Sequence, residues 1–355
     1  MAPTAVAVHT QRPIVLVDAL RTSVPAPPQA RCGRPIGAWH APCVNFAPVV
    51  QALERVSAAT QAIGSAGPSR GRGPTPYQAD VRTVRNAPDR GGTGRAALLG
   101  GLDGVAALRV AHSALIVDGL TDLFRAAGSR TPGGVNGPVL AAGVRALAEA
   151  AAETAWLLDP SIDGIARCRR YIRWKLHVHD TDLGHIERAH EDPTTDEDEV
   201  AAARSAMAEE TARLTADIEA AGRSVSTTGK NGKPASLALL SPTGGRESFP
   251  NRGELVAGLL GSPRLYPLIS RAAHIEHSGI TGSLTRISEA RDGRVLVHMT
   301  GDGLPDGSQL LVVAKAVNAT AGELAAWSGR ANGHLLEALR ELAALGHASF
   351  QARRT

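Results

Sequence analysis

The fold is decided by residues 160–221, which read PSIDGIARCRRYIRWKLHVHDTDLGHIERAHEDPTTDEDEVAAARSAMAEETARLTADIEAA. Apolar or small side chains recur every three or four residues in both halves of this stretch, and charged residues flank them. Narrow stripes of this kind are typical of two long helices that pack against each other. The link contains Pro193, and Thr195 with Asp198 nearly matches a capping box for the second helix. The sequence therefore predicts a long antiparallel helical hairpin.

Helical periodicity continues on both sides of the hairpin. Before it, one helix is predicted from about residue 104 to 128 and another from 138 to 158. After it, the sequence predicts a flexible loop over 222–250, a short strand over 294–299, and helices over 252–261, 263–288, 308–328 and 333–346. We expect the first helix to bury the stripe Leu108, Ala111, Leu115, Leu120, Leu123 and Ala127. The expected fold class is mainly α, a helical bundle with a long antiparallel hairpin.

Residues 1–100 differ in composition from the rest of the chain. They hold 11 arginines, four acidic residues and 12 of the 22 prolines. Proline-rich segments resist regular hydrogen bonding, so we expect a largely disordered arm rich in Arg, Pro and Gly, with one short amphipathic helix over about 46–63. The helical domain is then expected over 101–350. The arm has two interpretations, a basic tail that contacts nucleic acid or a partner, and an extension without function.

The cysteine count and the first residues indicate the compartment. Three cysteines, Cys32, Cys43 and Cys168, cannot form a disulfide framework. The N-terminal stretch has no basic start followed by an apolar block. We therefore expect a cytoplasmic protein that does not enter a membrane.

Side chains that commonly bind metal ions are concentrated between residues 177 and 192. On a helix, His179 and His190 fall on the apolar stripe, whereas His177 and His185 point elsewhere. A ligand set needs side chains that converge on one point. The sequence therefore predicts no metal site and no cofactor.

Two sets of polar side chains are each spaced by four residues, so each set lines one face of a helix. The first set is Arg145 and Glu149, and the second is Tyr266, Ser270 and His274. If the two faces meet, they form a charge-assisted network that includes a titrating histidine. We favour a buried structural clasp over a catalytic site, because buried polar groups need partners whether or not they react.

Two motifs carry a resemblance to a known family. The stretch RALAEAAAETAWLLDP, residues 145–160, contains R-x-x-x-E and W-L-L-x-P, and LYPLISRAAHIEH, residues 265–277, contains Y-x-x-x-S-x-x-x-H. The chain resembles a family of uncharacterised actinobacterial all-helical proteins over about residues 105–345. The resemblance implies no particular activity. It selects the same five polar residues and Trp156 as candidate site residues.

The chain is more distantly similar to HEPN domains, some of which are metal-independent ribonucleases with an R-x4-6-H motif near the end of a helix. Arg271 and His277 match that motif as R-x5-H. The resemblance implies that these two residues would be catalytic, and that dimerisation would bring two copies of the motif together.

We expect a non-enzymatic helical interaction module as the main function. The two stripes of the hairpin, residues 160–221, are expected to leave apolar surface for a protein partner or for a second copy of the chain. A HEPN-like ribonuclease is the first alternative. Nucleic-acid contact through the basic arm is the second.

Overall fold

The computed structural model describes residues 45–68, 74–89, 91–128, 137–192, 194–228, 236–241, 245–263, 266–267, 270, 286–289, 295–298 and 307–352. The described part of the chain is mainly α, which confirms the predicted fold class. Arg271, His274 and His277, and the proposed arm up to residue 44, lie outside the described residues.

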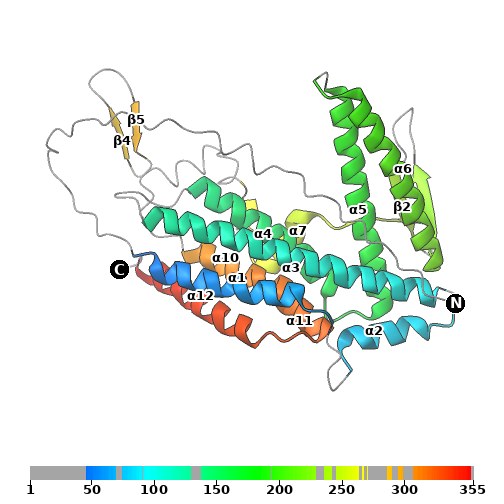
Figure 1. Ribbon diagram of the computed structural model, residues 1–355, viewed down its shortest axis with the longest axis horizontal. Coiled ribbons are helices and arrows are strands. Elements are labelled where there is room, and N and C mark those ends of the chain that lie inside the picture. Colours follow the sequence, from blue (N-terminus) through cyan, green and yellow to red (C-terminus); the bar gives the residue numbers. More distant parts are fainter. Residues whose placement is uncertain are drawn as a thin grey trace, which may run out of the picture. The chain divides into compact units, whose positions relative to one another are not determined.

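A bundle of helices is built around α3, Gly92–Gly128. Helix α1, Ala47–Ser65, lies beside α3 along much of its length (Figure 1). Helices α4, Gly137–Leu158, and α12, Gly333–Ala352, complete the bundle together with α10, Gly307–Val317. Their shared core consists mainly of leucine, valine and alanine side chains, as the low aromatic content of 3% requires.

Helix α3 buries only part of the predicted stripe, including Leu120 and Ala127. Its core residues include Leu102, Val110 and Val117, whereas Leu108 is 70% exposed and Leu115 is 65% exposed. Apolar side chains occur on both faces of this helix, so its periodicity alone could not identify the buried face. The predicted stripe is therefore wrong at these two leucines.

The helical domain begins well before residue 101. Phe46 and Leu53 are buried in the same core as α3, and α2, Pro76–Arg85, packs on α3 and α5. Thr75 and Gln78 form a capping box at the start of α2. The helix expected at 46–63 is confirmed, but the boundary at residue 100 is wrong, because the described helices α1 and α2 pack on α3.

The hairpin prediction is confirmed by α5, Gly164–Glu191, and α6, Glu197–Ala220, which pack against each other. The N-cap of α6 is Asp196, whose Oδ1 accepts a hydrogen bond from the backbone N–H of Asp198, in place of the expected Thr195. Buried stripe residues such as Leu176 and Leu214 close the hairpin. Ile165 is the only large apolar side chain of the described hairpin that is clearly exposed, and association through the hairpin stays a prediction.

The segment expected to be a flexible loop, 222–250, contains a three-stranded antiparallel sheet. Its strands are β1, Val225–Thr228, β2, Ser236–Leu240, and β3, Arg246–Glu247, in the order β1-β2-β3. Leu237 and Leu239 of β2 are buried. Alternating apolar residues within a stretch rich in Gly and Lys were too few to indicate these strands from the sequence.

The C-terminal elements largely follow the prediction. Helix α7, Arg252–Leu260, confirms the helix at 252–261 and ends at Gly261, whose φ of 69° is left-handed. Helix α10 continues through a π-helical turn, Asn318–Gly322, into α11, Glu323–Ser328. Strand β5, Val295–His298, confirms the predicted strand and pairs antiparallel with β4, Arg286–Glu289, so the helix predicted over 263–288 is wrong at its end.

Two described helical stretches, Gly92–Gly128 and Gln309–Ser328, are long and apolar enough to span a membrane by length and composition. Both also contribute many side chains to the core of the bundle.

Candidate functional site

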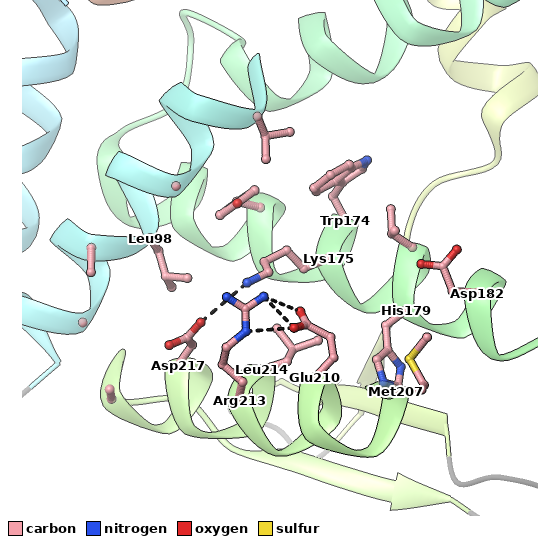
Figure 2. A pocket seen from close by; sticks show the side chains of 17 residues that line it. Leu98, Trp174, Lys175, His179, Asp182, Met207, Glu210, Arg213, Leu214 and Asp217 are labelled. Carbon is pink, nitrogen blue, oxygen red and sulfur yellow. Dashed lines mark hydrogen bonds and ion pairs between the residues drawn. The ribbon is translucent and has the colours of Figure 1, made fainter. Parts of the chain in front are cut away.

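A cleft of about 470 Å³ lies between α3 and the α5–α6 hairpin (Figure 2). Small residues of α3, Gly94, Ala97 and Gly101, form one wall. A Cβ atom at Gly94 would collide with the backbone of Ala220, so α3 and the end of α6 touch at this point. The contact fixes one end of the cleft, and the short α3 side chains beyond it leave the cavity open.

Aromatic side chains of α5 line the cleft opposite α3. The rings of Tyr171 and Trp174 are stacked, with centroids 5.8 Å apart and planes 10° apart. The indole N–H of Trp174 donates a hydrogen bond to Glu153 Oε2 at 3.1 Å, and the guanidinium of Arg109 lies 4.9 Å from the indole ring. Burial, with a smaller effect from Asp217, raises the pKa of Tyr171 to about 12. The site therefore presents a neutral phenol and an indole held in a fixed orientation.

Charged side chains form the floor of the cleft (Figure 2). Lys175 Nζ lies 3.6 Å from Asp217 Oδ2. Arg213 donates from Nε and Nη2 to the two carboxylate oxygens of Glu210, each at 2.8 Å. The hydrogen bond to Glu210 raises the pKa of Arg213. With the exposed Asp182, the cleft contains three carboxylates and two cations.

His179 is buried at the cleft wall. Its Nε2 lies 2.7 Å from Thr211 Oγ1, and the Thr211 hydroxyl donates to the carbonyl oxygen of Met207 at 2.7 Å. Because that hydroxyl has only one proton, Nε2 must be the donor to Thr211. Among the described residues Nδ1 has no hydrogen-bond partner, since Asp180 Oδ1 is 3.8 Å away.

A polar clasp beside the cleft contains part of the predicted cluster. Arg145 Nε donates to Glu149 Oε1 at 2.7 Å, and the hydroxyl of Tyr266 donates to the same oxygen at 2.8 Å. Ser270 is half-buried, and His274 lies outside the described residues. The structure thus brings Arg145, Glu149 and Tyr266 together across helices, as the shared faces suggested.

The most buried member of the clasp, Glu153, was missed by the sequence analysis. It forms an ion pair with Arg109 and accepts a hydrogen bond from Arg252 Nε at 2.9 Å. Burial raises the pKa of Glu153, but the attraction of Arg109 and the hydrogen bonds outweigh it and hold the pKa below the ordinary value. Its position four residues after Glu149 was the available signal, since it extends the same helical face.

Two other histidines of α5, His177 and His185, do not line the cleft. His177 stacks on Phe249 with ring centroids 4.6 Å apart, and Phe249 meets Trp156 edge to face. His185 Nδ1 lies 3.0 Å from Arg188 Nη2. Within the described ranges no group of three or more His, Cys, Asp or Glu side chains could hold a metal ion.

The ribonuclease hypothesis stays a prediction, because Arg271 and His277 are outside the described residues. The described site offers a different chemistry: an apolar wall, a flat aromatic surface and a charged floor around a cavity open to solvent. No protein-family model, curated protein or solved structure matches the chain.

Proposed function

We propose that the protein is a non-enzymatic helical binding module whose cleft between α3 and the hairpin takes a small amphipathic molecule with a flat apolar part and an amine. The observation that carries the proposal is the cavity itself, with the stacked Tyr171 and Trp174 at its wall. Its volume of about 470 Å³ falls in the range of small-molecule sites.

The apolar part of the ligand is assigned by the two walls. Leu98 and Val105 of α3 lie on one side, and Trp174 lies on the other. Aromatic faces favour offset stacking with other flat groups. The indole of Trp174 is held by Glu153, Tyr171 and Arg109, so it would lose little conformational entropy when a ligand packs against it.

The amine is assigned by the charge of the floor. Lys175 and Arg213 are each compensated by a carboxylate, Asp217 and Glu210, which leaves Asp182 as the excess charge. An excess of one carboxylate at the rim of the cleft favours a cation over an anion. A ring face next to a cation site adds a cation–π attraction.

Binding is favoured over proton-transfer chemistry by the state of the clasp. Glu153, which accepts the hydrogen bond of Trp174, and its neighbour Glu149 are each held by arginine side chains. A general base in the neutral range needs a pKa close to the working pH. A carboxylate whose pKa is lowered, as in Glu153, is poorly suited to that role.

The test is calorimetric titration of the full chain with tryptamine, indole and indole-3-acetate. We expect tryptamine to bind most tightly, indole weakly and indole-3-acetate least. In Ala97→Phe the new ring occupies the cleft, so affinity should fall by about tenfold or more, which corresponds to about 1.4 kcal/mol. Ala208→Phe, at an exposed position of α6 outside the cleft, is the matched control and should bind as the unmodified chain does. Equal affinity in Ala97→Phe, or no binding of any of the three probes, would contradict the proposal.

A further inference from the structure

The outward face of α3 continues beyond the cleft as a bare, uncharged surface. Between residues 104 and 119 the exposed residues of this helix are Gly104, Leu108, His112, Leu115 and Gly119. They recur every three or four residues, so they form one ridge along the helix. Leu108 at 70% and Leu115 at 65% are the most exposed large apolar side chains of the described chain.

The two glycines of this ridge have no role inside the described fold. A Cβ atom added at Gly104 or at Gly119 would meet nothing within 4 Å. Glycine in a helix interior costs about 0.5–1 kcal/mol relative to alanine. Glycines on a helix surface do, however, let a second helix approach closely. The ridge thus carries a stability cost that the packing of the single chain does not explain.

The order of residues along the ridge is symmetric. Gly104 and Leu108 are separated by four residues, and so are Leu115 and Gly119, with Ala111 and His112 at the centre. A twofold axis through that centre would place a second α3 antiparallel to the first. Leu108 of one copy would then face Leu115 of the other, and Gly104 would face Gly119. Such self-complementarity is what an interface between identical chains requires.

From this arrangement we infer that the α3 ridge, residues 104–119, is the surface through which two copies of the chain associate. The face has no Asp, Glu, Lys or Arg among its exposed residues, and the neighbouring Arg109 and Asp118 are only partly exposed, so pairing two copies desolvates little permanent charge. The partner at this surface is therefore a second copy of the chain. The two copies pack through α3 and not through the hairpin. This inference is independent of the proposed ligand cleft.

Sedimentation velocity of the full chain over tens of micromolar tests the inference. We expect a monomer–dimer equilibrium. The double variant Leu108→Arg with Leu115→Arg should raise the dissociation constant by about a hundredfold or more, because each arginine would be buried at the interface without a partner. Both side chains are exposed in the single chain, so circular dichroism should show unchanged helicity. Leu336→Arg, at a 38% exposed leucine of α12, is the control and should leave the equilibrium unchanged.

Cysteine cross-linking tests the antiparallel register. In a chain with its three cysteines replaced by serine, an equal mixture of the Leu108→Cys and Leu115→Cys proteins should form disulfide dimers faster than either protein alone. A monomer at every concentration would overturn the inference, and so would a dimer that the two arginines leave intact. A monomer that sediments with phosphatidylcholine–phosphatidylglycerol vesicles, and loses this binding in the double arginine variant, would overturn it in favour of a lipid surface.

Discussion

Two regions of the molecule bury polar side chains in different ways. At the junction of α2, α5 and α11, Asp80 Oδ2 accepts hydrogen bonds from Arg167 Nε at 2.9 Å and from Trp327 Nε1 at 2.7 Å. The remaining N–H groups of Arg167 donate to three backbone carbonyls, those of Leu157, Asp159 and Ile162. In the hairpin cleft, by contrast, the ion pair between Lys175 Nζ and Asp217 Oδ2 is long, at 3.6 Å. His179 Nδ1 has no hydrogen-bond partner among the described residues.

We infer from this difference that the junction stabilises the fold and that the cleft can bind a ligand. A junction whose donors and acceptors are satisfied within the chain contributes stability and leaves nothing for a ligand. A cleft that holds a loosely paired lysine and a histidine nitrogen without a described partner keeps groups that a ligand can use. The comparison predicts large stability effects at the junction and small ones at the cleft.

The largest effect is expected for Asp80→Ala. The substitution leaves the buried guanidinium of Arg167 without its counter-ion and removes the acceptor of Trp327. Removing one partner of a buried ion pair costs about 3–5 kcal/mol. Urea denaturation should show this loss. The matched control Asp182→Ala, at the exposed rim of the cleft, should change the free energy of unfolding by less than about 0.5 kcal/mol.

Glu153→Gln should have an intermediate effect, because Glu153 joins the clasp to the cleft. Replacing its charge should cost about 1–3 kcal/mol near neutral pH. The folded-state pKa of Glu153 lies below its ordinary value of 4.5, so its charge stabilises the folded chain above pH 4.5. As the pH falls through the lowered pKa, this contribution disappears. Urea denaturation of both proteins as a function of pH should therefore show a difference that shrinks toward acid, and a constant difference would contradict the assignment.

His179→Leu should have a small effect on stability. The Thr211 hydroxyl keeps its hydrogen bond to Met207, and the substitution removes a buried nitrogen that has no described partner. Replacing an unsatisfied polar group with an apolar one is close to neutral or stabilising. We expect the free energy of unfolding to change by less than about 1 kcal/mol. A loss as large as that of Asp80→Ala would show that the two regions are not different in kind.

The reactivity of the native Cys168 thiol can measure how often the junction opens, and no residue of the junction has to be replaced. Burial raises the pKa of this thiol to about 12, so it is almost entirely protonated near neutral pH. In a chain with Cys32→Ser and Cys43→Ser, iodoacetamide should label Cys168 only through opening of the structure. Mass spectrometry should find faster labelling once Asp80→Ala is added. Rapid labelling of the folded chain without that substitution would contradict the burial of Cys168.

The hairpin could be predicted from sequence because its apolar period runs unbroken through both helices. The pair Arg145 and Glu149 could be placed on one face for the same reason of spacing. The buried face of α3 could not, since Leu108 and Val110 have similar hydrophobicity and only the packing of α1 and α4 decides between them. The cleft also could not be predicted, because it joins Ala97 of α3 to Trp174 of α5, which share no sequence pattern.

The most direct test of the ligand cleft is the indole N–H resonance of Trp174 during titration with tryptamine. The resonance is identified by its loss in Trp174→Phe. We predict a saturable shift of the Trp174 signal, because this indole lines the cleft, while the signal of Trp327, buried on Asp80, stays in place. An unchanged Trp174 signal at saturating tryptamine, or an equal shift of Trp327, would contradict ligand binding in the cleft.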